Sequence, residues 1–129
     1  MRLFLIRHAK AHPGEPDEAR ALAEKGVEQA KRLGVTLSLH PTPPAVVLTS
    51  PLLRARQTAE AISRATGAEL RVDDRIGPGA TAESVRSALA GLEGPVAAVG
   101  HQPDCSEIAL ALTGADPGFP TAGMLELEL

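Results

Sequence analysis

Short apolar runs alternate with longer segments of helical character along this chain, and no other feature of the sequence constrains the fold as strongly. The runs with the length and composition of buried strands are 2–6, 45–49, 68–72 and 95–100. The segments with helical spacing or helix-boundary residues are 26–39, 50–66, 81–92 and 101–112. Strands that alternate with helices build a mainly parallel sheet with helices on both faces. The sequence therefore predicts a three-layer α/β/α fold, formed by residues 1–129 as a single domain.

Several residues mark the ends of these elements. Ser50 is suited to cap the second helix, Pro51 to occupy its first position and Gly67 to end it. Thr81 is typical of the start of the third helix. The C-terminal residues 124–129 alternate leucine with glutamate, which is the period of a half-exposed strand. We therefore expect one further strand at the end of the chain.

Composition excludes several classes of function. The 129 residues include 13 Lys and Arg against 16 Asp and Glu, so no excess of positive charge would attract nucleic acid or a membrane surface. No apolar run approaches the length of a membrane span or of the core of a signal peptide, and we expect a cytoplasmic protein. Cys105 is the only cysteine, which rules out an intramolecular disulfide and a cysteine-rich metal site.

Basic and histidine side chains follow three of the predicted strands. Arg7 and His8 come directly after the first run, the segment TSPLLRARQT begins at the end of the second, and His101 follows the run 95–100. The carboxyl ends of parallel strands meet at one edge of a sheet, and ligands bind there. We therefore expect these side chains to share one pocket with an arginine of the middle segment.

Helical periodicity distinguishes Arg54 from Arg56 in that middle segment. At ~100° per residue the two side chains point about 200° apart. Arg56 lies in a row with Glu60 and Arg64, which is typical of a solvated face with ion pairs. Arg54 lies in the first helical turn, beside free backbone N–H groups that attract anions. Arg54 is therefore the arginine that we expect in the pocket.

Arg7, His8, Arg54 and His101 each have an ordinary structural explanation when taken alone, but together they suit a phosphoryl group. Guanidinium groups offer permanent charge and paired donors that match phosphate oxygens. A neutral histidine can act as a nucleophile, and a second histidine can donate a hydrogen bond to developing charge. No carboxylate cluster with metal-ligand spacing accompanies them. The residues therefore favour phosphoryl chemistry without a metal or another cofactor.

Three stretches resemble the motifs of a known family. LIRHA, TSPLLRARQTA and VGHQP are similar to those of the histidine phosphatase superfamily, also called the phosphoglycerate mutase-like or RHG family. Ala9 replaces the glycine of many members, and RALAEKGVEQA (20–30) resembles a further family segment, with Ala21 and Ala23 in place of proline and threonine. The short chain and the loop DDRIGPGA (73–80) most resemble the bacterial phosphohistidine phosphatase branch known as SixA.

The resemblance implies a phosphoglycerate mutase-like fold and a role for each motif residue. His8 would be the nucleophile and would carry a phosphohistidine intermediate, which water then hydrolyses. Arg7, Arg54 and His101 would bind the phosphoryl oxygens and stabilise charge in the transition state. Arg20 matches a family arginine near the substrate entrance and is a candidate phosphate or substrate contact.

The loop 73–80 departs from the pattern of larger family members, which place a glutamate after the third strand to protonate an alkoxide. This loop offers only Asp73 and Asp74. An imidazole that leaves from phosphohistidine can already carry a proton on its other ring nitrogen, and it therefore needs less help from an acid. A signalling or phosphorelay protein that bears phosphohistidine is the expected substrate, although Asp74 would serve as an acid if the loop folded inward.

The residues leave two alternatives open: a small-molecule phosphomonoesterase of the same superfamily, and a non-catalytic module that binds a phosphorylated ligand. Cys105 lies on an apolar helix face and is expected in the core. His12, in a proline-containing loop near the pocket, and His40, on the far side from it, are expected to be bystanders. The segment EPDEAR (15–20) is expected to be a solvated loop or helix start, with recognition of a protein partner as its alternative.

Overall fold

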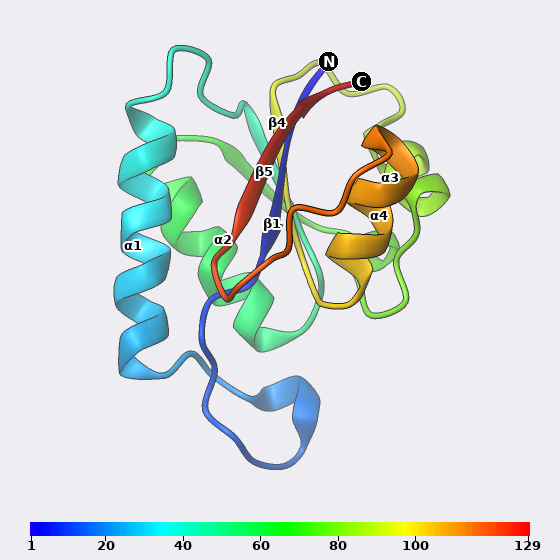
Figure 1. Cartoon of the computed structure of the whole chain (residues 1–129). Helices are drawn as coiled ribbons and strands as arrows, with labels where there is room; N and C mark the ends of the chain where they lie inside the picture. Colours follow the sequence, from blue (N-terminus) through cyan, green and yellow to red (C-terminus); the bar gives the residue numbers. More distant parts are fainter.

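A five-stranded sheet forms the centre of the computed structural model, which describes residues 1–129 (Figure 1). Its strands are β1 (Arg2–Arg7), β2 (Val46–Thr49), β3 (Glu69–Val72), β4 (Val96–Gly100) and β5 (Met124–Glu128). They lie in the order β3-β2-β4-β1-β5, and only β5 runs antiparallel to its neighbour. The mainly parallel sheet expected from the alternating pattern is confirmed, as is the strand at the end of the chain.

Helices cover both faces of this sheet, as the sequence predicts. They are α1 (Glu24–Ser38), α2 (Leu53–Thr66), α3 (Ala82–Leu89) and α4 (Asp104–Thr113). Figure 1 shows α1 and α2 on one face and α3 with α4 on the other. Two short 3-10 helices, η1 (Asp17–Ala19) and η2 (Asp74–Ile76), lie in the connections. None of the helices is long and apolar enough to cross a membrane.

Alternate residues of β1 belong to two separate cores, because successive side chains of a strand face opposite sides of a sheet. Leu3 and Leu5 pack into the core beneath α3 and α4. Phe4 and Ile6 pack into the core beneath α1 and α2. All four side chains are buried, which explains why the apolar run at the start of the chain is continuous rather than alternating.

The register aligns the carboxyl ends of β1, β2 and β4. Arg7 of β1 pairs with Gly100 of β4, and Thr49 of β2 pairs with the preceding Val99. The residues that follow these three strands therefore leave the sheet at the same edge: His8, Ser50 and His101.

The predicted start of α2 is wrong. The helix begins at Leu53 with Leu52 as its N-cap, and neither Ser50 nor Pro51 is helical. The Ser50 hydroxyl instead accepts a hydrogen bond from the N–H of Leu52 at 3.2 Å and contacts His101. Ser50 therefore makes its contacts at the sheet edge, before the helix, and does not cap it.

The other boundary residues behave as predicted. Gly67 ends α2 in the left-handed region, at φ 77°, which glycine adopts without a steric cost. Thr81 caps α3, and Ser84 completes a reciprocal capping box with it. The predicted helices at 81–92 and 101–112 are both shorter in the structure, because α3 ends at Leu89 and α4 begins at Asp104.

The N-terminus of α1 packs directly against the loop that follows His8. The N–H of Ala23 donates to the Lys10 carbonyl at 2.9 Å. A Cβ at Gly26 would lie 1.9 Å from the same carbonyl oxygen, so no residue with a side chain fits there without moving the loop. This close approach holds the loop after His8 in place.

Candidate active site

His8 and His101 lie side by side at the carboxyl edge of the sheet. The N–H of His8 donates to the Gly100 carbonyl at 3.0 Å, which ties the two strand ends together where the histidines emerge. The two ring centroids are 5.2 Å apart. His8 is 9% exposed and His101 is 6% exposed, yet neither belongs to an apolar core. The structure therefore brings the two predicted histidines into one buried polar site.

The hydrogen bond at Nδ1 of His8 determines which ring nitrogen is free to react. Nδ1 lies 2.7 Å from the carbonyl oxygen of Ala9, which can only accept, so Nδ1 carries the proton and Nε2 carries the lone pair. Burial lowers the pKa of His8 to about 4, and the nearby charges of Arg54 and Arg7 act in the same direction. The hydrogen bond to Ala9 acts against this shift but is outweighed. The ring is therefore neutral at neutral pH, which is the form that a nucleophile requires.

Arg54 enters the site from the first turn of α2 and contacts His8 directly. Its Nε donates to His8 Nε2 at 3.3 Å, and its side chain is 9% exposed. Arg56 points elsewhere: its Nε donates to the Pro51 carbonyl at 3.0 Å. The predicted separation of the two arginines is seen, although the ion-pair row on the outer face contains only Glu60 and Arg64, 3.7 Å apart.

Two buried nitrogen atoms of the site have no hydrogen-bond partner, namely Nε of Arg7 and Nδ1 of His101. The Arg7 guanidinium is held by one bond, from Nη1 to the Phe119 carbonyl at 3.0 Å. Phe119 lies between α4 and β5, and nothing in the sequence pointed to its carbonyl. A buried donor without a partner is costly unless a ligand supplies one. The two atoms are therefore available to an anion that enters the site.

Ser50 orients His101 and was not recognised from the sequence as part of the site. Its Oγ lies 2.7 Å from His101 Nε2. When the Ser50 hydroxyl donates to Nε2, a neutral His101 carries its proton on Nδ1, the atom that has no partner. Burial, then His8 and Arg54, lower the pKa of His101 to about 4, so the neutral ring needs this arrangement to act as a donor. The sequence signal that could have assigned Ser50 to the site is its position directly after β2.

Ser50→Ala is expected to lower kcat/KM about tenfold at neutral pH, which is the cost of one buried hydrogen bond that sets a tautomer. The ratio of kcat/KM between wild type and variant should shrink as the pH falls toward the pKa of His101. A protonated His101 carries N–H groups on both ring nitrogens, so it no longer needs Ser50 to place a proton on Nδ1. Steady-state kinetics between pH 7 and 4 measure this ratio. A ratio that does not change with pH, or a loss explained by a lower thermal midpoint, would contradict the positioning role.

Asp17 links Arg20 to the site, and it was not singled out from the sequence. Its carboxylate accepts from Arg20 Nη1 at 3.0 Å and from Arg54 Nη2 at 3.2 Å, and its carbonyl accepts from Arg54 Nη1 at 2.9 Å. These bonds to Arg20 and Arg54 hold the pKa of the Asp17 carboxyl below its ordinary value. The segment 15–20 contains the exposed helical turn η1, as the sequence allowed, and in addition brings a carboxylate to the site. The signal was the three-residue spacing from Asp17 to Arg20, which one turn brings to the same side.

Asp73 and Asp74 do not contact the site. The Asp73 carboxylate bonds the Arg75 guanidinium at 2.8 Å and caps η2, and Asp74 has no side-chain hydrogen bond. Neither carboxylate pairs with an arginine or histidine of the site. His12 contributes only its carbonyl, which accepts from Arg20 Nε at 2.6 Å.

His40, the other predicted bystander, has no contact with the site, and Cys105 meets it only through its backbone N–H, which donates to the His101 carbonyl at 2.8 Å. His40 bonds the Glu126 carboxylate and packs edge-on against Phe4. Cys105 is buried in the core beneath α3 and α4, as expected.

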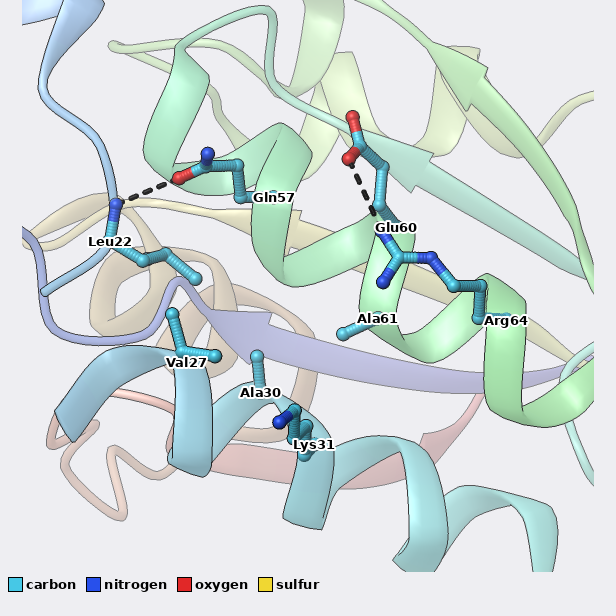
Figure 2. Close-up of a pocket in the computed structure, with 8 residues that line it drawn as sticks. All are labelled: Leu22, Val27, Ala30, Lys31, Gln57, Glu60, Ala61 and Arg64. Atoms are coloured by element: carbon cyan, nitrogen blue, oxygen red, sulfur yellow. Dashed lines mark hydrogen bonds and ion pairs between the residues drawn. The ribbon is translucent and has the colours of Figure 1, made fainter. Parts of the chain in front are cut away.

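A hollow of about 190 Å³ lies between α1 and α2, apart from the histidines (Figure 2). None of the arginines or histidines of the site lines it. On its rim the side chain of Gln57 accepts from the Leu22 N–H at 2.8 Å. This bond anchors to α2 the segment that carries Asp17 and Arg20.

Positive charge dominates the site. Arg7, Arg20 and Arg54 contribute three permanent charges and Asp17 one negative charge, while both histidines are neutral at neutral pH. The net formal charge of +2 would neutralise the charge of −2 on a phosphoryl dianion. No group of three His, Cys, Asp or Glu side chains is arranged to hold a metal ion.

Comparisons with known proteins identify chains of similar sequence and fold. A model of the histidine phosphatase superfamily (branch 1) matches residues 3–77. An uncharacterised protein of Picosynechococcus sp. is 36% identical over 99% of this chain and 85% of its own length. A crystal structure from Agrobacterium tumefaciens, assigned as the phosphohistidine phosphatase SixA, is 34% identical, with a TM-score of 0.84 over 98% of this chain and 90% of that one. The protein histidine phosphatase SixA in complex with tungstate is 24% identical and has the same fold, with a TM-score of 0.89 over 100% of this chain and 88% of that one.

Proposed function

Because the chain belongs to the histidine phosphatase superfamily, we propose that it is a phosphatase in which His8 accepts the phosphoryl group from substrate. The observation that carries the proposal is the pair of buried nitrogens without partners, Arg7 Nε and His101 Nδ1, in a site where the His8 and His101 rings lie 5.2 Å apart. A phosphoryl group bonded to Nε2 of His8 would receive hydrogen bonds from both. Arg54, whose Nε donates to His8 Nε2, would add a third contact from the first turn of α2.

In the first step Nε2 of His8 attacks phosphorus, and the bond from phosphorus to the leaving group breaks. The Nδ1–H bond to Ala9 keeps the opposite nitrogen protonated. The phosphorylated ring is therefore cationic and remains a good leaving group. In the second step water attacks phosphorus, the P–N bond breaks, and inorganic phosphate leaves with neutral His8 restored. The arginines balance the phosphoryl charge throughout, and we include metal independence in the proposal.

The proposed substrate is phosphohistidine in a signalling or phosphorelay protein in the cytoplasm. An alkoxide leaving group needs a proton, and no carboxylic acid stands ready: Asp73 is engaged with Arg75, and Asp17 is held in its ionised form. Imidazole has no such requirement when its other nitrogen is protonated. The name of the Agrobacterium relative, a phosphohistidine phosphatase, supports the same substrate class.

Rapid-quench trapping across a substrate panel tests the proposal. The panel contains a phosphohistidine protein, sugar phosphates, nucleotides and p-nitrophenyl phosphate, each labelled on phosphorus, and the quench is alkaline because P–N bonds hydrolyse in acid. We expect a labelled enzyme intermediate that survives alkali, together with the highest kcat/KM on the phosphohistidine protein.

A strong preference for sugar phosphates or nucleotides would contradict the substrate assignment. Binding of phosphate without turnover at high enzyme concentration would contradict the enzymatic role and favour a ligand-binding module.

A further inference from the structure

Asp17 is the only carboxylate that pairs with the arginines of the site, and it lies on the far side of Arg54 from the nucleophile. Nε of Arg54 contacts His8, whereas Nη1 and Nη2 both contact Asp17. We propose that the Asp17 carboxylate accepts a hydrogen bond from the distal ring N–H of the leaving imidazole and thereby makes the enzyme specific for phosphoramidates over phosphate esters. This inference rests on the proposed function and assigns the substrate class to one side chain.

The position of Asp17 suits contact with a leaving group that belongs to another protein. Its side chain is 58% exposed, while that of Arg54 is 9% exposed, so Asp17 stands at the mouth of the site and Arg54 inside it. Arg20 binds the second carboxylate oxygen, and Gln57 anchors the chain at Leu22. The carboxylate is thus held in place by two arginines and is still accessible to a protein substrate from solvent.

The chemistry of His8 shows what the leaving imidazole requires. At His8 the nitrogen opposite the reactive Nε2 keeps its proton because Nδ1–H donates to Ala9. The phosphoryl group passes from the imidazole of the substrate to the imidazole of His8, so the two rings have nearly equivalent roles. The departing ring therefore also needs an acceptor for the N–H on its distal nitrogen. Within the site the Asp17 carboxylate is the acceptor with a negative charge, and a charge-assisted bond of this kind is roughly twice as strong as a neutral one.

The atoms and charges of the step balance without a proton transfer. The P–N bond to His8 Nε2 forms and the P–N bond to the substrate breaks. The electron pair of the broken bond returns to the substrate nitrogen, and the ring leaves as neutral imidazole with its proton on the distal nitrogen. Asp17 stays ionised throughout. An alcohol would instead leave as an alkoxide with no N–H, and the negative charge of Asp17 would oppose its formation.

Asp17→Asn tests this assignment with two substrates whose leaving groups differ. Turnover of phosphoimidazole is expected to fall about 10- to 100-fold, which is the effect of weakening one charge-assisted hydrogen bond. Turnover of p-nitrophenyl phosphate should fall by a clearly smaller factor, because nitrophenolate is a stable anion that needs neither a proton nor an N–H acceptor, whereas any disturbance of Arg54 affects both substrates alike. Glu18→Gln is the matched control, since Glu18 is the exposed neighbour in η1 and its side chain makes no hydrogen bond or ion pair; it should change neither rate.

A second measurement uses the wild-type protein alone, so it holds even if the variant folds poorly. Methylation of the distal nitrogen of phosphoimidazole removes the N–H but keeps the ring cationic and its leaving ability high. We expect the wild type to hydrolyse the methylated compound at least about tenfold more slowly than phosphoimidazole. Equal rates on the two compounds, or equal losses on both substrates in Asp17→Asn, would overturn the role of Asp17.

Failure of the proposed function would appear differently. In that case the wild type would give no alkali-stable phosphoenzyme, or would prefer sugar phosphates or nucleotides over the phosphohistidine protein, before any variant is compared.

Discussion

Replacing His8 with alanine is expected to abolish turnover, with kcat reduced about 1,000-fold or more, because the variant loses the atom that forms the covalent intermediate. No neighbouring group can substitute for it. His101 bonds Ser50 through Nε2, and Cys105 is buried with a pKa raised to about 12 by burial and Asp104. Steady-state turnover of the phosphohistidine protein and alkaline trapping of the phosphoenzyme measure the loss. Residual activity within about tenfold of wild type would refute the assignment of His8 as nucleophile.

The folded state of His8→Ala should survive the change, because the His8 side chain lies outside the three apolar cores. Its pH dependence supplies an independent check. The pKa of His8 is about 4 in the folded protein against an ordinary value of 6.5, so the unfolded chain takes up a proton more readily between these values. The stabilising contribution of neutral His8 is full above pH 6.5 and is lost as the pH falls through this window. Denaturant unfolding should therefore show a smaller loss of stability in the variant than in wild type between pH 6.5 and 4.

The convergence of Arg7, His8 and His101 could be predicted because it follows from topology alone. An alternating strand and helix pattern implies parallel strands, and parallel strands end at one edge. The register then places Arg7 opposite Gly100, so residues that are adjacent to strand ends in the sequence become neighbours in space. Arg54 could be added because a helix has a fixed angular period, which excludes Arg56 without any knowledge of the sheet.

Asp17 and Ser50 could not be assigned in the same way, because their roles depend on contacts between segments that the sequence does not connect. Asp17 meets Arg54 across 37 positions of the chain, and its three-residue spacing from Arg20 indicates a pairing with Arg20 but not this contact. Ser50 satisfies the local rule for a helix cap, but its hydroxyl instead lies 2.7 Å from His101, which follows another strand. Local rules anticipate where the chain turns, whereas the partner of a polar side chain at a sheet edge is decided by tertiary packing.

Arg54→Ala is expected to reduce kcat/KM about 100- to 1,000-fold, the usual cost of removing a donor that faces charge developing in the transition state. The same change at Arg56 should cost less than about threefold, because its guanidinium is turned toward the Pro51 carbonyl. Arg54→Lys should fall between them, since an ammonium keeps the charge but cannot contact His8 and Asp17 with one planar group.

The Arg56→Ala variant is the matched control for this comparison, because it removes the same side chain from the same helix. Steady-state kinetics on the phosphohistidine protein give kcat/KM for each of the three variants relative to wild type. Thermal midpoints identify any variant that has lost activity because it is unfolded. Equal losses at positions 54 and 56 would contradict the division of α2 into a face that serves the site and a face that does not. A lysine variant as active as wild type would show that positive charge alone suffices at position 54. The simultaneous contact of one planar guanidinium with His8 and Asp17 would then not matter for turnover.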